Sequence, residues 1–407
     1  MTGRSSNPHS PLPITPVAWE AFAHERAIRW HSSSKWPHPK RLIEISSAIP
    51  SDQILRLLQQ GTAILWRGDF HEGRQILQSV KRRLSNYMRR AIKLPMPQGF
   101  HQLRLARSQQ ARTLGLILIQ IDPDWSLVNR RAPDIRAACE ATLGDAAATH
   151  ACLQTRSLSG EKHDTTDTPP VILPLSDLLG ILSAYQWHLK GVEVAALGAR
   201  IHPRHGVFAP TRQEYLELVA GTALPATCES AIDLGTGTGV IAAILAQKGV
   251  PSVLAIESHQ PALQCARDNI DRLGLGDRVT VRKGDLLTGA PVVDLIVCNP
   301  PWLPGVARNP LEAAIHDPEH RMLRGFLAQA PTHLPPSGQA WLIISDLAEL
   351  LGLRSRETLL QWISEAGLRV IDRVDTRATH PKAADQKDPL APWRAREVTS
   401  LWRLSLA

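Results

Sequence analysis

The chain has 407 residues, of which 43% are apolar, and a formal net charge of +8. This length and composition predict a globular protein of two domains, and no run approaches the ~18 uninterrupted apolar residues of a membrane-spanning helix. The five cysteines are scattered without C-x-x-C spacing, which argues against a disulfide framework or a zinc site and for reduced thiols in the cytoplasm.

The beginning of the chain is polar and carries many Pro and Ser residues, so we expect residues 1–40 to be only partly ordered. No apolar h-region follows the first residues, and no secretory signal is therefore expected. Together with the reduced thiols, this predicts a cytoplasmic protein that has no membrane partner.

Residues 41–153 are predicted to form a basic accessory domain that is mainly helical, with one buried strand at residues 114–121. Residues 1–136 hold 21 Lys and Arg against 9 Asp and Glu. This excess indicates either a well-solvated surface or one that binds an anion, and nucleic acid is the first candidate. Apolar residues at helical spacing form the face of one predicted helix: Ile76, Leu77, Val80, Leu84, Tyr87, Met88 and Ala91.

A polar stretch with Gly and Pro, residues 154–170, is the predicted linker. Strand and helix signals alternate over residues 171–407, which predicts an α/β domain with a Rossmann-like, mostly parallel sheet. The last two strands have no helical pattern between them, so we expect an antiparallel C-terminal hairpin with a long polar connection at 379–396. The expected strands are 231–234, 252–256, 278–282, 292–298, 339–345, 368–375 and 397–404, and the expected helices are 240–247, 260–273, 320–333 and 356–365.

A glycine-rich turn joins the first of these strands to a helix. It reads Asp233-Leu-Gly-Thr-Gly-Thr-Gly239, and glycines permit both a sharp turn and the close approach of a ligand. The spacing is G-x-G-x-G, which differs from the G-x-G-x-x-G of a dinucleotide site. Glu257 follows the next strand, where a carboxylate can accept from both hydroxyls of a ribose. Asp285 follows the third strand, where it can accept from the amino group of an adenine.

The tetrapeptide Asn299-Pro300-Pro301-Trp302 closes the strand expected at 292–298. Two prolines forbid its continuation, because neither can donate to a neighbouring strand. Asn299 is therefore held at the carboxyl end of a parallel strand, where open α/β sheets bind ligands. Its amide oxygen and the Pro300 carbonyl are two acceptors, and Trp302 adds a flat face, a set suited to a planar NH2 group. The alternative is a strand-ending turn whose tryptophan packs into the core.

These motifs, each placed after its own strand, resemble those of class I S-adenosylmethionine-dependent methyltransferases of the "methyltransferase small domain" type. That group includes ribosomal RNA guanine and adenine N-methyltransferases and release-factor glutamine methyltransferases, and the resemblance runs from about Gly206 to the C-terminus. It implies S-adenosylmethionine as the cofactor and Asn299, Pro300 and Trp302 as catalytic residues. Trp302 departs from the Tyr or Phe that is usual there, which leaves the subfamily open. The cofactor-binding residues that the resemblance implies are Asp233, Gly235, Thr236, Gly237, Gly239, Glu257, Asp285, Asn299, Phe208 and Thr211.

The sequence thus predicts an N-methyltransferase that acts on a planar exocyclic NH2, and RNA, above all ribosomal RNA, is the first candidate because of the basic front half. The second interpretation is methylation of a glutamine amide in a protein, and the third is a non-catalytic binding protein with a relic methyltransferase fold. No strong general base is needed, because the reaction depends on aligning a nitrogen lone pair with the methyl donor. No metal is expected, and we interpret residues 202–205 as a loop and 316–320 as a helix start.

Overall fold

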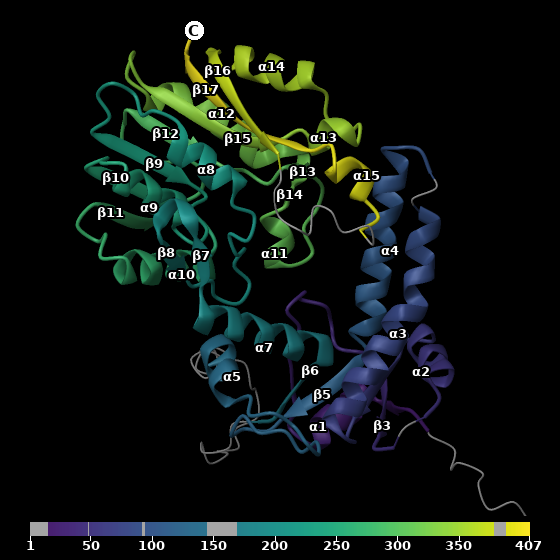
Figure 1. Ribbon diagram of the computed structural model, residues 1–407. Coiled ribbons are helices and arrows are strands. Elements are labelled where there is room, and N and C mark those ends of the chain that lie inside the picture. The colour runs from purple at the N-terminus through teal and green to yellow at the C-terminus, as the bar shows by residue number, and fades with distance from the viewer. Residues whose placement is uncertain (1–14, 48, 92–93, 145–168, 378–387) are drawn as a thin grey trace, which may run out of the picture. The chain divides into compact units, whose positions relative to one another are not determined.

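The computed structural model describes residues 15–47, 49–91, 94–144, 169–377 and 388–407 (Figure 1). The chain divides into two compact units: the first is Met1–Met88 with Arg104–Leu182, and the second is Arg89–Leu103 with Ser183–Ala407. This division differs from the boundary expected at 154–170, most of which lies outside the described residues. The reason is that β6 (Val171–Pro174), which comes after the expected linker, is a strand of the first unit's sheet.

The first unit is built on a sheet. In the described residues this sheet has six strands in the order β1-β3-β4-β5-β6-β2, and β3, β4 and β5 run parallel. Trp19 and Phe22 of α1 pack on it together with Leu42 and Leu118. The elements of this part of the chain are β1 (Val17–Ala18), α1 (Trp19–Glu25), β2 (Arg29–Trp30), β3 (Arg41–Ile45), α2 (Ser51–Gln59), β4 (Thr62–Trp66), α3 (Phe70–Ala91), α4 (Gln98–Leu114), β5 (Ile117–Ile121) and α5 (Arg136–Leu143).

The prediction of a mainly helical accessory domain is correct in that its helices exceed its strands in length, but it misses the sheet. The sequence predicts β5 and none of the strands that flank it. Of the predicted apolar face of α3, Leu77, Val80 and Leu84 are buried and Ile76 is partly exposed. The side chains of its last members, Tyr87, Met88 and Ala91, are not among those described. Residues 15–40, expected to be only partly ordered, hold β1, α1 and β2.

The second unit is built on a larger sheet, with seven strands in the described residues ordered β11-β10-β9-β12-β15-β17-β16. The first five strands are parallel, and β17 is antiparallel to both β15 and β16. This confirms the predicted Rossmann-like sheet with an antiparallel C-terminal hairpin. The chain order reverses between β9 and β12, a switch point of the kind at which open α/β sheets bind ligands. The strands are β9 (Ser230–Leu234), β10 (Ser252–Glu257), β11 (Val279–Lys283), β12 (Leu295–Cys298), β15 (Gln339–Ser345), β16 (Leu368–Arg377) and β17 (Val398–Leu406).

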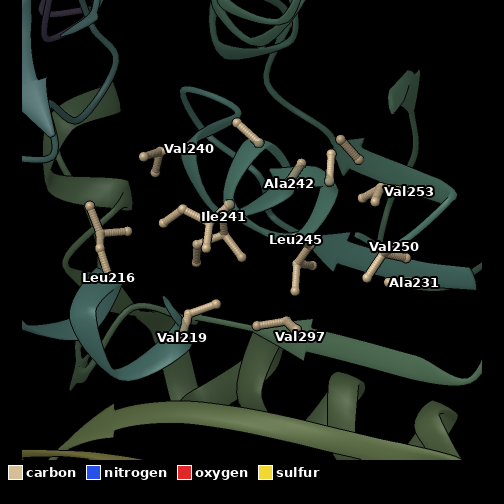
Figure 2. Close-up of a cluster of buried hydrophobic side chains, with 14 of the residues drawn as sticks. Leu216, Val219, Ala231, Val240, Ile241, Ala242, Leu245, Val250, Val253 and Val297 are labelled. Atoms are coloured by element: carbon tan, nitrogen blue, oxygen red, sulfur yellow. The ribbon is translucent and has the colours of Figure 1, made fainter. Parts of the chain in front are cut away.

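Helices cover both faces of this sheet. On one face α9 contributes an almost entirely apolar sequence, and Figure 2 shows its side chains beside Ala231 of β9 and Val297 of β12. Their strand neighbours Ile232 and Ile296 point to the other face, where they pack in a cluster with Phe326 of α12. The helices of residues 175–407 are α7 (Leu175–Lys190), which begins in the first unit, α8 (Glu214–Gly221), α9 (Val240–Gln247), α10 (Gln260–Arg272), α11 (Pro310–Ala313), α12 (Arg321–Gln329), α13 (Leu347–Leu350), α14 (Arg356–Glu365) and α15 (Ala391–Arg394).

Short elements connect these layers, and two pairs of them form small two-stranded sheets, β7 with β8 and β13 with β14. Among the described helices, none has both the length and the apolar character needed to cross a bilayer. The short elements are β7 (Val192–Val194), η2 (Ala195–Leu197), β8 (Ala199–Ile201), β13 (Leu303–Pro304), β14 (His316–Asp317), η3 (Pro318–His320) and η4 (Ala330–His333).

The sequence predicts the elements of the second sheet closely, and α9, β15 and α14 have their expected bounds. The largest difference within the sheet is β12, which begins at Leu295, three residues after its expected start. Val292 is 58% exposed, and the carboxylate of Asp294 accepts hydrogen bonds from the backbone amide and the hydroxyl of Ser230. These residues therefore approach the strand without extending it.

Candidate active site

A cavity of about 820 Å³ lies at the carboxyl ends of the parallel strands of the second unit. Its volume is in the range of small-molecule sites. The glycine loop, the residues that follow β10, β11 and β12, the segment before α8 and the segment before β17 form its wall. The predicted site residues that line it are Phe208, Thr211, Gly235, Thr236, Gly237, Glu257, Asp285, Asn299, Pro300 and Trp302.

The register of the sheet brings the motifs together. Leu234, at the end of β9, pairs with Ile256 of β10 on one side and with Cys298 of β12 on the other. The glycine loop, Glu257 and Asn299 directly follow these three residues. Because the three strands are parallel neighbours, their ends place the loop between the carboxylate and the amide.

The glycine loop has the conformation that its glycines predict. Gly235, Gly237 and Gly239 have positive φ angles of 73°, 58° and 82°, which side-chain-bearing residues rarely adopt. A Cβ atom on Gly235 would collide with the side chain of Met322, which also lines the cavity. A Cβ atom on Gly239 would meet the backbone of Ala266 in α10 at 3.4 Å. This is an ordinary van der Waals distance, so the positive φ of Gly239 and not a lack of space favours glycine there, and Gly239 does not line the cavity.

Asp233 lies behind the loop and is 1% exposed. Its Oδ2 accepts from the Thr236 hydroxyl at 2.5 Å and from the backbone amide of Ala242 at 2.9 Å. Burial raises the pKa of Asp233 to about 7, although these two hydrogen bonds act in the opposite direction. The resemblance implies a cofactor contact here, whereas the structure gives Asp233 the role of tying the loop to α9.

Two carboxylates face the cavity in different environments. Glu257 is 9% exposed, and its oxygens accept from the backbone amides of Gly237 at 3.0 Å and His259 at 2.9 Å. The Asp285 side chain is 60% exposed and forms an ion pair with Arg321 at 2.5 Å. The backbone holds the first carboxylate in place, while the second is paired with Arg321, which was not predicted as a site residue.

Asn299 and Trp302 contact each other. The indole Nε1–H of Trp302 donates to Oδ1 of Asn299 at 2.9 Å. Between them Pro300 is buried, and Trp302 is half-buried against the cores on both faces of the sheet. The tryptophan thus has the core contact of the alternative interpretation and also faces the cavity.

A buried ion-pair network adjoins Trp302. The guanidinium carbon of Arg212 lies over the indole ring, 5.1 Å from its centroid. Arg212 donates to Glu214 at 2.5 Å and to both oxygens of Glu397 at 3.1 and 3.3 Å. Glu397 also accepts from the hydroxyl of Ser345 at 2.6 Å. Burial acts to lower the pKa of Arg212, but Glu397 and Glu214 outweigh it and raise the pKa.

Arg212 and Glu397 line the cavity and were not predicted as site residues. Arg212 closes the segment 206–212, and Glu397 follows the connection predicted at 379–396, of which residues 378–387 lie outside the described part of the chain. These two positions are 185 residues apart in sequence. Arg212 precedes α8 and Glu397 precedes β17, and the contact of α8 with β17 brings the two residues together.

The segment 316–320 is a helix start, as predicted. Asp317 accepts from the backbone amides of Met322 and Leu323 at 3.0 and 3.1 Å, which caps α12. In the loop at 202–205, Nδ1 of His202 lies 2.7 Å from the carbonyl oxygen of His188. Within the described residues, no group of three or more His, Cys, Asp or Glu side chains is arranged to hold a metal ion.

Comparison with known proteins finds similarity for the segment that holds most of the residues lining the cavity. Residues 198–351 match the family described as "Methyltransferase small domain". A release factor glutamine methyltransferase of Thermosynechococcus vestitus is 32% identical over 195 residues, which cover 43% of this chain and 62% of that protein. A ribosomal protein uL3 glutamine methyltransferase of Bordetella pertussis is 34% identical over 28% of this chain and 43% of that protein. The chain therefore spans less than two thirds of the length of either relative.

Among solved structures, a ribosomal protein L11 methylase from Lactobacillus delbrueckii subsp. bulgaricus aligns with a TM-score of 0.34 and 20% identity. The alignment covers 51% of this chain and 84% of that one.

Proposed function

We propose that this chain, whose residues 198–351 match the methyltransferase small domain family, transfers a methyl group from S-adenosylmethionine to the nitrogen of a side-chain carboxamide in a protein. One observation carries the proposal: the register of β9, β10 and β12 opens the glycine loop, Glu257 and Asn299 into one cavity. A place for the donor and a place for a planar NH2 group are thus adjacent.

The residues of the cavity fit this cofactor. Glu257 offers a buried carboxylate for ribose hydroxyls, and Asp285 offers an exposed one for an adenine amine. A Cβ atom on Gly237 would have its nearest neighbour 4.0 Å away, so the bare glycine leaves room for a ligand against the backbone. When bound, S-adenosylmethionine supplies a methyl group whose S–C bond breaks as the new N–C bond forms, and one N–H proton then leaves to water.

The acceptor residues prepare the nitrogen. The lone pair of a carboxamide nitrogen is delocalised into its carbonyl, which makes it a poor nucleophile. Oδ1 of Asn299 and the carbonyl of Pro300 would accept the two N–H groups, which favours a pyramidal nitrogen with a localised lone pair. Fixing this geometry is the main contribution that the protein needs to make, since correct orientation alone provides a large part of such rate accelerations.

Two observations favour a carboxamide over a nucleobase. The relatives described above are named for glutamine methylation of a release factor and of ribosomal protein uL3. In addition, Arg212 already covers one face of the Trp302 ring, so a base could stack only on the opposite face. A glutamine side chain needs the hydrogen bonds at Asn299 but not the stacking surface.

A second candidate is a nucleobase in RNA, and the charge of the front half supports it. Residues 1–136 hold 21 Lys and Arg against 9 Asp and Glu. Lys81 and Arg82 of α3 are exposed. Arginines and lysines of this kind bind phosphates in a salt-dependent manner.

Labelling distinguishes the two targets. Purified protein is incubated with methyl-labelled S-adenosylmethionine and a lysate from a strain that lacks the gene, and the product is treated with nuclease or with protease. We expect the label to resist nuclease and to be released by protease. The opposite pattern would favour the nucleobase, and the absence of any transferred label would contradict methyltransferase activity.

A further inference from the structure

We infer that Trp302 is a positioning residue, which fixes the carboxamide of Asn299 in the orientation that presents its oxygen to the substrate. The inference rests on the proposed function and adds to it a role for the indole N–H. It starts from the hydrogen bond of 2.9 Å between Nε1 of Trp302 and Oδ1 of Asn299.

An asparagine side chain can rotate by half a turn, which exchanges its oxygen and its nitrogen with little change in shape. Only the oxygen can accept from substrate N–H groups, because the amide nitrogen is a donor. The indole N–H is also only a donor, so the rotated Asn299 would set two donors against each other. The tryptophan therefore selects one of the two orientations. The carbonyl oxygen has two lone pairs, and after one is used by the indole the other is available for the substrate.

The position of the Trp302 ring depends in turn on residues that are distant from it in the sequence. Arg212 covers it at 5.1 Å, and Arg212 is fixed by Glu214 and Glu397, whose residues are 1% and 2% exposed. Glu397 is joined to β15 through the hydroxyl of Ser345. The orientation of Asn299 at the end of β12 thus depends on the ends of β15 and β17. Side chains held by several buried hydrogen bonds have little freedom to move, which is what a positioning role requires.

This arrangement gives the tryptophan at this position a purpose that phenylalanine cannot serve. Phenylalanine keeps a ring for stacking and for contact with Arg212 but has no donor. A tyrosine hydroxyl can both donate and accept, so it would tolerate either orientation of Asn299. The indole is the aromatic group that enforces a single orientation.

The first test is Trp302→Phe, assayed with the fraction of the deletion-strain lysate that accepts label from the wild-type protein. We expect kcat to fall about tenfold, the effect of one hydrogen bond, while the KM for the acceptor changes little. Trp362→Phe is the matched control, because Arg324 lies over that ring at 5.5 Å and Trp362 does not line the cavity. The control variant should keep wild-type kinetics. A raised KM with unchanged kcat would assign Trp302 to stacking, and wild-type kinetics would exclude both roles.

The second test removes the choice of orientation. Asn299→Asp has an oxygen at both ends of the side chain, so nothing remains for Trp302 to select. In that background Trp302→Phe should lower kcat by less than about twofold, whereas independent effects would multiply. A tenfold lower kcat in the double variant than in Asn299→Asp alone would overturn the inference. If Asn299→Asp transfers no label, the division between kcat and KM in Trp302→Phe alone decides.

Failure of the proposed function would give a different result from failure of this inference. Without methyltransferase activity, the wild-type protein itself would transfer no label to the lysate. If the function holds and the inference fails, the wild-type protein transfers label and Trp302→Phe keeps the wild-type kcat.

Discussion

The two ends of the cavity are held in place by different parts of the polypeptide. At the glycine-loop end the backbone does the holding, since the first two amides of the loop donate to the carbonyl of Ile256, and Glu257 accepts from two further amides. At the other end side chains hold side chains, from Glu397 through Arg212 to Trp302 and Asn299. The bond from Gly237 to Glu257 at the cofactor end spans 20 positions of the sequence, whereas that from Arg212 to Glu397 at the acceptor end spans 185. Substitutions at the two ends should have separable effects.

The largest effect is expected for Asn299→Ala. The substitution removes the acceptor that activates the target nitrogen, and we expect kcat to fall by about 10²- to 10³-fold, as when a single transition-state hydrogen bond is lost elsewhere. Initial rates of label transfer measure it. Asn309→Ala is the matched control, because Oδ1 of Asn309 caps α11 by accepting from Glu312 and its side chain is not part of the cavity wall. An unchanged rate in Asn299→Ala would contradict the proposed mechanism.

Glu257→Ala should weaken cofactor binding at the glycine-loop end of the cavity. It removes the carboxylate proposed for the ribose together with the partner of the Gly237 amide, and hydrogen bonds to a charged group are worth about 1.5–3 kcal/mol each. We expect the Kd for S-adenosylmethionine to rise by about 10²-fold, as measured by calorimetry. Glu217, an exposed residue of α8, provides the control Glu217→Ala. Equal affinities for all three proteins would show that Glu257 does not bind the cofactor.

Asp233→Asn tests whether buried Asp233 supports the glycine loop, because the stability of the wild type and that of the variant should depend differently on pH. The pKa of Asp233 is raised to about 7 by burial, so its contribution to stability is complete below its ordinary pKa and is lost as the pH rises toward 7. Asparagine does not titrate. The free energy of unfolding of the wild type should therefore fall relative to that of the variant by about 1 kcal/mol or more between pH 5 and pH 7. Urea denaturation at both pH values measures this, and a difference that is independent of pH would contradict a buried, titrating Asp233.

The smallest effect is expected for Asp285→Asn. The side chains of Asp285 and Arg321 are 60% and 64% exposed, and exposed ion pairs contribute little. We expect the Kd for S-adenosylmethionine to rise only about two- to fivefold, because asparagine keeps one acceptor oxygen. Asp277→Asn, at an exposed position outside the cavity wall, is the control. A loss as large as that of Glu257→Ala would remove the distinction between the two carboxylates.

The sequence predicts the second sheet and the cofactor end of the cavity well, for a physical reason. Buried parallel strands are continuous apolar runs, and the glycine loop needs glycines at fixed positions. Their bounds and the positions of Glu257 and Asn299 can thus be read without knowing what packs against them. The role of Asp233 is harder to predict, because an aspartate at this position could lie behind the loop or face the cavity, and the sequence would be the same in both cases.

The acceptor end and the first unit are predicted poorly, because both depend on contacts distant in sequence. Arg212 and Glu397, 185 positions apart in sequence, become neighbours through the contact of α8 with β17. The hydrogen bond from Trp302 to Asn299 spans only three residues, yet it requires a side-chain orientation that sequence does not specify. In the first unit, the strands β3 and β4 have five residues each and are followed in the sequence by helices, whose periodicity dominates the pattern of apolar residues.

Calorimetric titration of Asn299→Ala with S-adenosylmethionine tests the central claim, that one cavity holds a donor site and a separable acceptor site. We expect a Kd within about twofold of the wild-type value in a protein whose label transfer is nearly abolished. Loss of cofactor binding as severe as that of Glu257→Ala would contradict it.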